Sequence, residues 1–203
     1  MFTEVQRLKI ERMKEFLKDF KGNMVLDAGC GYNPLSKEVA EGCIIGLDIK
    51  LECLKEAKKL GLEVVSADLN RGIPFKDESF DLIIATGNIP SIIYDTDYLL
   101  EEMRRVLKML GVLIIDVYNT CSLRNRLRVG VGLTPLGLMP LGIGIKAFNK
   151  SIFVALLEKH HFRIEDVRAT EIRIPKIAGI PWRYKFLVSL GEFIIVKCRK
   201  VRK

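Results

Sequence analysis

Short apolar runs alternate with amphipathic segments along the first 120 residues. The runs are apolar on both faces, which is typical of strands buried in the middle of a sheet. Between them, apolar residues recur every three or four positions, as in helices that pack one face on a core. This alternation predicts an α/β fold with a doubly wound, mostly parallel sheet and helices on both faces. The expected strands are 24–29, 43–49, 62–68, 80–86 and 111–119, and the expected helices are 3–20, 34–42, 51–61 and 97–109.

The first expected strand ends in a glycine-rich turn, VLDAGCGYNP at residues 25–34. In an open parallel sheet, ligands bind beyond the carboxyl ends of the strands, where a strand turns into its helix. Gly29 and Gly31 allow the backbone to turn tightly and to approach a ligand closely. Asn33 is predicted to cap the next helix, and Pro34 to occupy its first position. We therefore expect a ligand at this turn.

The acidic residues near the turn indicate which ligand it binds. Asp48 ends the second expected strand, where a carboxylate accepts hydrogen bonds from ribose hydroxyls. Pro34 departs from the G-x-G-x-x-G pattern of nicotinamide-binding proteins, and Asp27 stands two residues before the first glycine. A carboxylate there disfavours a pyrophosphate and favours a ligand with positive charge, such as a sulfonium with an amino group. A dehydrogenase that binds a dinucleotide remains an alternative.

Four motifs follow one another in this part of the chain: LDAGCG, GLDI, SADLNRGIPFKDESFDLII and LLEEMRRVLKMLGVLII. With them, about residues 20–120 resemble the class I S-adenosylmethionine-dependent methyltransferases. More specifically, these residues resemble the type 11 branch, which is similar to the quinone-biosynthesis methyltransferases. It implies a Rossmann-like sheet of seven strands and S-adenosylmethionine as the cofactor. Asn33 replaces a usual third glycine, and Met109 with Leu110 replaces the usual proline and glycine before Gly111.

The resemblance also implies roles for individual residues. Asp27, Gly29 and Gly31 would line the methionine portion of the cofactor, and Asp48 would hold its ribose. Asp68 with Leu69 would recognise the adenine, and Thr86 would lie near the methionine portion. The cofactor-binding residues implied in this way are Asp27, Ala28, Gly29, Gly31, Asp48, Ile49, Asp68, Leu69 and Thr86.

Catalytic residues are less clearly marked. Methyl transfer from a sulfonium to a nucleophilic acceptor mainly needs alignment and exclusion of water. Cys30 is interpreted as a packing thiol rather than a nucleophile. The chain reads ATGNIPS after the fourth strand, where enzymes that methylate adenine or glutamine nitrogens have Asn-Pro-Pro-aromatic, so that chemistry is not expected. Residues that could assist an acceptor are Asn88, Asp116, Tyr118 and Asn119, and Asn88 and Tyr118 are the catalytic candidates among them.

Charge divides the chain into two parts. Residues 1–120 contain 16 basic and 20 acidic residues, whereas residues 121–203 contain 17 basic and 5 acidic residues, within a net charge of +8. Such asymmetry indicates an anionic partner for the second part, for example nucleic acid, phospholipid or a phosphorylated substrate. A solvated basic surface is the alternative explanation.

Residues 129–145 contain no charged residue and follow three arginines at positions 124, 126 and 128. Five glycines and two prolines within them argue against a membrane-spanning helix. A mobile apolar lid over a hydrophobic acceptor, or a loop resting on a membrane, fits this composition. A buried insertion or a dimer contact is the alternative. IPWRYKF at residues 180–186 alternates aromatic and basic residues, which suits either base stacking or an edge strand.

These observations predict one domain over residues 1–203. Its expected parts are an N-terminal helix at 1–22, a cofactor-binding core at 23–120, a lid-like apolar insertion at 121–150, and a C-terminal helix with strands at 151–203. The five cysteines fit neither a disulfide framework nor a zinc site, so we expect no metal. The amino terminus has no apolar run of the signal-peptide kind, which favours a cytoplasmic protein with optional contact to a membrane surface.

The function expected from the sequence is transfer of a methyl group from S-adenosylmethionine to a small or lipid-like hydrophobic acceptor. One alternative is an RNA methyltransferase that uses the basic C-terminal part. Another is a non-catalytic subunit that binds S-adenosylmethionine and supports a partner protein. The sequence does not indicate the oligomeric state.

Overall fold

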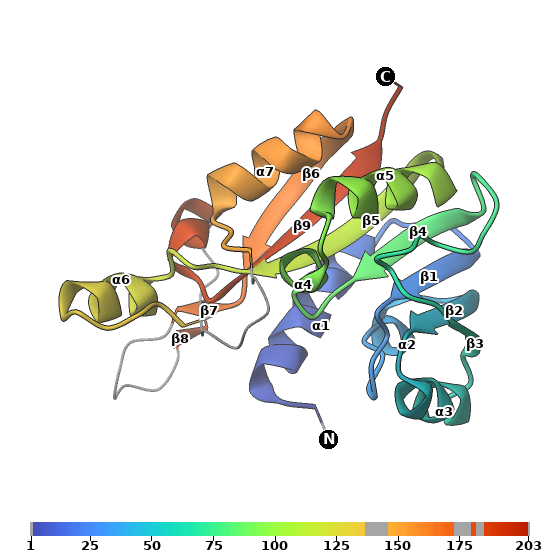
Figure 1. Cartoon of the computed structure of the whole chain (residues 1–203), viewed down its shortest axis with the longest axis horizontal. Helices are drawn as coiled ribbons and strands as arrows, with labels where there is room; N and C mark the ends of the chain where they lie inside the picture. The colour runs from blue at the N-terminus through green and yellow to red at the C-terminus, as the bar shows by residue number, and fades with distance from the viewer. Residues whose placement is uncertain (1, 137–145, 173–179, 182–184, 203) are drawn as a thin grey trace.

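The computed structural model describes residues 2–136, 146–172, 180–181 and 185–202 of the 203-residue chain. Its centre is a seven-stranded sheet with the strand order β3-β2-β1-β4-β5-β9-β6 (Figure 1). β9 runs antiparallel to both of its neighbours, and the pairs among β1 to β5 are parallel. The strands are β1 Met24–Ala28, β2 Cys43–Asp48, β3 Glu63–Ser66, β4 Phe80–Ala85, β5 Leu107–Tyr118, β6 Phe162–Ala169 and β9 Phe193–Lys200.

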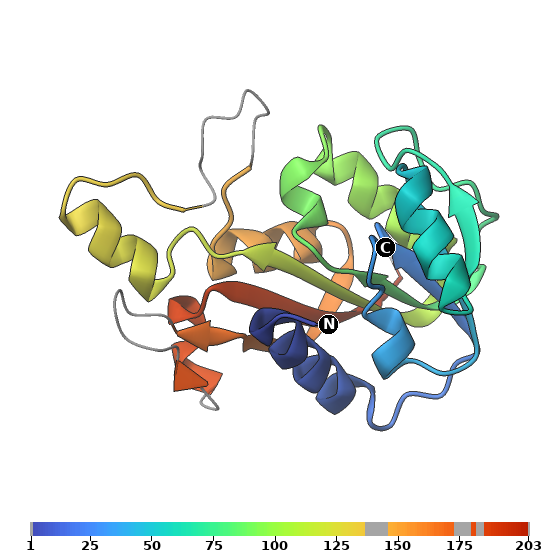
Figure 2. The same cartoon turned by 90° about the horizontal axis from the view of Figure 1, so that it is seen from below.

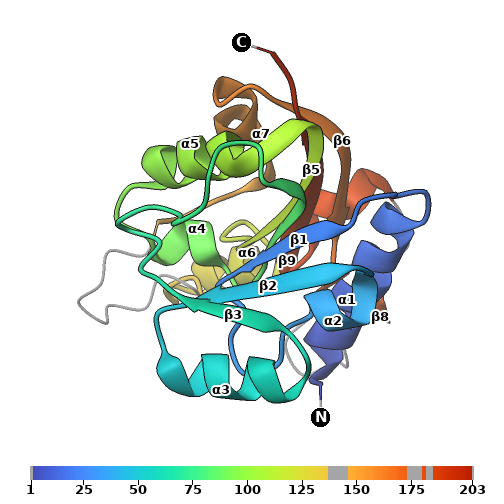
Figure 3. The same cartoon turned by 90° about the vertical axis from the view of Figure 1, so that its right-hand side faces the viewer.

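Helices cover both faces of the sheet, which confirms the predicted doubly wound, mostly parallel arrangement (Figure 3). α1 Glu4–Leu17 and α3 Leu51–Lys59 pack on one face, and α5 Thr96–Val106 and α7 Lys150–Lys159 pack on the other. α6 Leu123–Gly130 projects away from the body of the molecule in both Figure 1 and Figure 2. The shorter elements are α2 Ser36–Val39, α4 Ile89–Ile92, the two-residue strands β7 Glu171–Ile172 and β8 Ile180–Pro181, and a 3₁₀ segment Lys185–Leu190.

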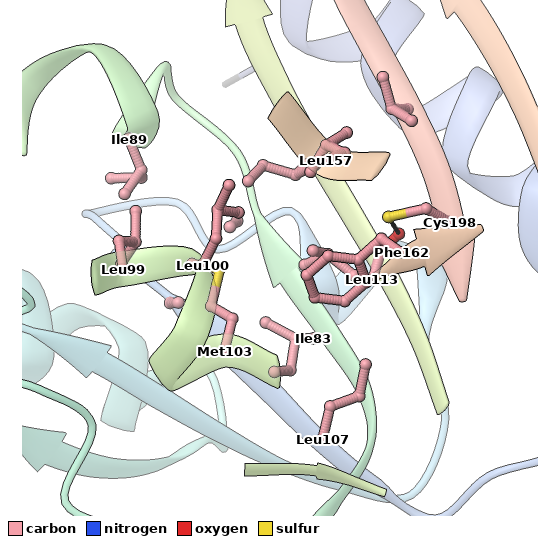
Figure 4. Close-up of a cluster of buried hydrophobic side chains, with 14 of the residues drawn as sticks. Ile83, Ile89, Leu99, Leu100, Met103, Leu107, Leu113, Leu157, Phe162 and Cys198 are labelled. Atoms are coloured by element: carbon pink, nitrogen blue, oxygen red, sulfur yellow. Dashed lines mark hydrogen bonds between the residues drawn. The ribbon is translucent and has the colours of Figure 1, made fainter. Parts of the chain in front are cut away.

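The central strands are buried on both faces, so neighbouring residues of one strand enter two different cores. One core joins Val25 of β1 to Met13 of α1. The other contains Leu26 of β1 and, as Figure 4 shows, Leu100 and Met103 of α5. This burial explains why the sheet can be recognised from continuous apolar runs in the sequence.

α1 begins at a capping box, which fixes its first turn. Gln6 N donates to Thr3 Oγ1 at 3.2 Å, and Thr3 N donates to Gln6 Oε1 at 2.9 Å. Met13 and Phe16 lie on the buried face of the helix, and Lys9 precedes them on the same face. A lysine on the apolar face of this helix must therefore find a partner inside the protein.

Two predicted helix boundaries are wrong. The helix expected at 34–42 is only α2, and its N-cap is Leu35, so Asn33 does not cap it. The helix expected to continue to residue 109 ends at Val106, because Leu107 already pairs with Phe80 in the sheet. The strand that follows therefore begins four residues earlier than expected, and Leu110 within it adopts a positive φ of 62°.

Part of the predicted apolar lid, residues 137–145, lies outside the described residues. Trp182 and Tyr184 of the aromatic and basic stretch also lie outside them. Within the described ranges, no helix is long and apolar enough to cross a membrane.

Candidate functional site

Two adjoining cavities lie beyond the carboxyl ends of the central strands. The larger has a volume of about 390 Å³ and the smaller about 300 Å³. Both are lined by Gly29, Gly31 and Tyr32, so they meet at the glycine turn that follows β1. This is the edge of the sheet at which the sequence predicts a ligand.

The glycine turn is held against the end of β2. Gly29 N and Cys30 N donate to Leu47 O at 2.7 and 3.1 Å. Gly29 has a φ of +76°, and a Cβ there would lie 2.5 Å from the Cδ1 atom of Ile89. Gly31 has a φ of +62°, and a Cβ there would meet no protein atom within 4 Å. A side chain at residue 29 would displace the end of the Ile89 side chain, whereas one at residue 31 would meet open space.

Asp48, at the end of β2, lines the larger cavity and contacts the turn directly. Its Oδ2 atom accepts a hydrogen bond from Gly31 N at 3.0 Å, and its Oδ1 atom accepts one from Lys50 N at 2.9 Å. Each carboxylate oxygen has two lone-pair positions, so both can still accept a hydrogen bond from a ligand hydroxyl. The carboxylate lines the cavity and also fixes the backbone beside it.

Asp68 and Leu69, after β3, form another wall of the larger cavity. Asp68 Oδ1 accepts hydrogen bonds from Asn70 N at 2.9 Å and from Asn70 Nδ2 at 3.0 Å. Asn70 Oδ1 in turn accepts one from Tyr94 N at 2.8 Å, which ties this loop to the segment before α5. Apolar side chains complete the cavity between the two carboxylates: Ile49, Leu69, Ile89, Ile92 and Ile93.

Asp27 and Ala28 lie in the buried part of β1, directly before the turn. Asp27 is 2% exposed, and its Oδ2 atom accepts a hydrogen bond from Ser36 Oγ at 2.5 Å. Burial raises the pKa of Asp27 to about 6, and the hydrogen bonds from Ser36 offset part of that rise. Cys30 is also buried, and burial raises its pKa to about 12. Its thiol is therefore protonated at neutral pH, in agreement with its interpretation as a packing residue.

The raised pKa of Asp27 predicts a stability that depends on pH. Because the folded protein holds this proton more tightly than the unfolded chain does, the contribution is fully present below the ordinary aspartate pKa of 3.8 and is lost as pH rises through about 6. The loss corresponds to about 3 kcal/mol at 1.36 kcal/mol per pKa unit. We expect Asp27→Asn to be more stable than the wild type at pH 8, with the difference disappearing near pH 4. Urea unfolding of both proteins across this range measures it, and a difference independent of pH would contradict it.

The smaller cavity brings α1 together with the loop after β4. Gln6 and Lys9 line it from α1, and Thr86 and Gly87 line it from that loop. Lys9 Nζ lies 2.6 Å from Asp116 Oδ2, and it also lies 3.9 Å from the centre of the Phe193 ring. The cavity is therefore more polar than its neighbour and has a buried cation in its wall.

Asp116 and Asn88 take structural roles at the ends of β5 and β4. Asp116 is fully buried, and its Oδ1 atom accepts hydrogen bonds from Gly87 N at 3.0 Å and Asn88 N at 2.9 Å. Asn88 Oδ1 accepts hydrogen bonds from Tyr118 N at 2.8 Å and Ser91 Oγ at 2.6 Å. These contacts hold the loop after β4 in place.

Tyr118 and Asn119 are also held by neighbouring groups. Burial, followed by the negative charge of Glu192, raises the pKa of Tyr118 to about 12. Its hydroxyl is therefore protonated at neutral pH and cannot serve as a base there. Asn119 is buried and donates through Nδ2 to Ser189 O and Gly191 O at 2.9 and 2.8 Å. The geometry gives all four polar candidates a supporting role and does not single out a base among them.

The structure adds site residues that were not predicted from the sequence. Gln6 and Lys9 come from α1, which the sequence suggested only as a helix preceding the core, and both line the smaller cavity. Tyr32 lines both cavities, and Asn70 lines the larger one. A signal for Lys9 was present, because it shares the helical stripe of Met13 with a spacing of four residues. A charged residue on such a stripe indicates a buried partner.

Comparison with known proteins gives a family match and several relatives. Residues 26–115 match the family model described as a methyltransferase domain. An uncharacterised protein of Methanocaldococcus jannaschii is 35% identical over 127 residues, which cover 61% of this chain and 51% of that protein. The probable tRNA methyltransferase 9B of Mus musculus is 34% identical over 120 residues, which cover 58% of this chain and 27% of that protein. The chain thus spans about half, or less, of the length of these relatives.

Solved structures match over nearly the whole chain. A SAM-dependent methyltransferase from Thermotoga maritima superposes with a TM-score of 0.70 and is 20% identical, covering 97% of this chain and 91% of that one. At this level of identity the likeness shows the fold.

Proposed function

We infer that residues 26–115, which match the methyltransferase domain family, form a methyltransferase domain of the type 11 branch of the class I S-adenosylmethionine-dependent enzymes, and on this premise we propose that the protein methylates a small or lipid-like hydrophobic acceptor. The cofactor of this family is S-adenosylmethionine. When bound, it supplies an electrophilic methyl group on a sulfonium. The chain has to hold the cofactor, orient the acceptor and exclude water.

The larger cavity suits the adenosine end of the cofactor. Asp48 would accept hydrogen bonds from the ribose hydroxyls, because its oxygens line the cavity and keep free lone pairs. Asp68 with Leu69 would recognise the adenine, whose faces pack on apolar side chains such as Ile49 and Ile93. About 390 Å³ lies within the usual range for a small-molecule site.

The smaller cavity suits the amino-acid end. Gly31 joins the two cavities, so a ligand can pass from one into the other without meeting a side chain at that position. Thr86 and Gly87 form one wall, and Lys9 brings positive charge to another. The buried Asp27 below the turn contributes negative charge nearby when it is ionised.

The proposed class of acceptor rests on the exposed surface of α6 and of the turn that follows it. Leu127, Val129, Val131 and Leu133 are each at least 44% exposed there. Three arginines lie on the same helix, at positions 124, 126 and 128. An exposed surface that combines apolar side chains and arginines suits an amphiphilic acceptor or the membrane that holds it.

α6 is linked to the site through a short series of contacts. Asn125 Nδ2 lies 3.5 Å from Tyr118 Oη, and Tyr118 N donates to Asn88 Oδ1 at 2.8 Å. Asn88 follows Gly87, which lines the smaller cavity. These contacts connect α6 to the loop that lines the smaller cavity, so an acceptor bound along α6 would lie on that side of the proposed cofactor site.

Labelled methyl transfer tests the acceptor class. The purified protein is incubated with S-adenosylmethionine labelled in its methyl group and an extract of the source cells, which is then separated into lipid, RNA, protein and small-molecule fractions. The proposal predicts label in the organic phase. Label confined to RNA or protein would contradict it, and cofactor binding without any labelled product would identify a non-catalytic binding subunit.

RNA is the second candidate acceptor. It is favoured by the similarity to a relative named as a probable tRNA methyltransferase and by the 17 basic against 5 acidic residues after position 120. If RNA is the acceptor, its binding should weaken steeply between 50 and 200 mM salt, because phosphate contacts release counterions. RNA that does not bind, or that binds equally well at both salt concentrations, would contradict this candidate.

The proposed ribose contact predicts a loss of affinity in Asp48→Ala. We expect S-adenosylmethionine to bind about 1 to 3 kcal/mol more weakly, because the variant lacks the acceptors for the ribose hydroxyls. Asp81→Ala is a matched control, because Asp81 also accepts hydrogen bonds from two backbone amides, Asn23 N and Met24 N, but lies away from the cavities. Titration calorimetry measures both variants, and equal affinities in the two would refute the ribose assignment.

A further inference from the structure

α1 contributes to the site from outside the sheet. Lys9 and Gln6 reach the smaller cavity, although they precede the matched methyltransferase domain in the chain. The side chain of Lys9 is only 6% exposed, and that of Asp116 is 0% exposed. A buried carboxylate needs a counter-charge, and Lys9 Nζ supplies it at 2.6 Å from Asp116 Oδ2.

The same carboxylate holds the loop after β4. Its other oxygen, Oδ1, accepts hydrogen bonds from two successive amides, those of Gly87 and Asn88. Both residues have positive φ values, 93° and 66°, in a loop of no regular structure. A backbone of this kind depends on surrounding groups to stay in one conformation. The loop is thus connected to α1 through Asp116.

We propose that the Lys9–Asp116 ion pair positions residues 86–88 and thereby shapes the subsite for the charged amino-acid end of the ligand. This inference rests on the proposed function of the two cavities. Thr86 and Gly87 line only the smaller cavity, whereas the carboxylates of the larger one, Asp48 and Asp68, come from the ends of β2 and β3. The ion pair therefore acts on one end of the ligand and leaves the adenosine end unaffected.

Two ligands that differ only at the amino-acid end test whether the ion pair affects that end alone. S-adenosylhomocysteine would extend into both cavities under the proposed function, and 5′-methylthioadenosine has the adenosine part without the amino-acid group. The double variant Lys9→Met/Asp116→Leu removes both charges together, so neither is left buried alone, and it also removes the oxygen that accepts from the two backbone amides. We expect S-adenosylhomocysteine to bind about tenfold more weakly to it, a difference of about 1.4 kcal/mol, with the affinity for 5′-methylthioadenosine within about twofold of wild type.

Lys200→Met is the matched control. Lys200 is also a buried lysine in an ion pair, with Nζ 3.2 Å from Glu78 Oε1, but it lies at the end of β9 away from both cavities. The Lys200→Met variant should bind S-adenosylhomocysteine and 5′-methylthioadenosine with the dissociation constants of the wild type. If the double variant binds both ligands like the wild type, or loses affinity for both by the same factor, the ion pair has no positioning role. If the wild-type protein binds neither ligand, the proposed function itself is overturned, and this inference with it.

Discussion

Gly31→Ala is expected to reduce the affinity for S-adenosylmethionine by more than about a hundredfold while the protein stays folded. Gly31 has a φ of +62°, so an alanine there costs about 1 to 2 kcal/mol of backbone strain, well below the stability of an ordinary domain. The added methyl group would meet no protein atom within 4 Å, and Gly31 lines both cavities. A ligand that spans the two cavities, as we propose, would have to pass this methyl group.

Gly132→Ala is the control that separates the effect of backbone strain from the effect of a methyl group placed beside the ligand. Gly132 has a φ of +76°, and a Cβ there also meets no protein atom within 4 Å, but it lies after α6. We expect this variant to lose a similar amount of stability and to bind S-adenosylmethionine like the wild type. Thermal unfolding and equilibrium dialysis of both variants give the comparison. Wild-type affinity in Gly31→Ala would mean that the ligand does not pass the glycine turn.

Lys9→Met alone is expected to lower the free energy of unfolding by about 3 to 5 kcal/mol, because it leaves the buried carboxylate of Asp116 without its counter-charge. That is a large share of the roughly 5 to 15 kcal/mol that stabilises a typical domain. Methionine fills the space of the lysine stem, so lost packing contributes little. Denaturant unfolding at pH 8 measures the effect.

Adding Asp116→Asn to Lys9→Met is expected to restore most of that stability. The double variant has no unpaired charge, and its amide oxygen can still accept the two hydrogen bonds that hold residues 87 and 88. Recovery would attribute the loss in the single variant to the unpaired charge. A single variant as stable as the wild type, or a double variant no more stable than the single one, would contradict this explanation.

The fold could be predicted where burial is complete. β1, β4 and β5 are apolar on both faces because helices cover both faces, and this pattern is visible in the sequence. The end of α5 at Val106 could not be predicted, because apolar residues continue beyond it at helical spacing and the helix is ended by the pairing of Leu107 with Phe80. That pairing is a tertiary contact, which local sequence does not record.

The residues of the site could likewise be predicted only where their sequence signals are local. Gly29, Gly31 and Asp48 could be identified because a turn and a strand end have local signatures, and the structure places them around shared cavities. Lys9 was missed, because its partner Asp116 stands at the end of a distant strand and only the folded chain brings the two together. Sequence patterns therefore indicated the glycine turn and the strand ends, but not the contribution of α1 to the smaller cavity.

Equilibrium dialysis of the wild-type protein with labelled S-adenosylmethionine is the most direct test of the central claim that the two cavities form a cofactor site. We predict saturation at one cofactor per chain, displacement by S-adenosylhomocysteine and no displacement by NAD. A folded protein that binds no S-adenosylmethionine, or that binds NAD in its place, would contradict the claim.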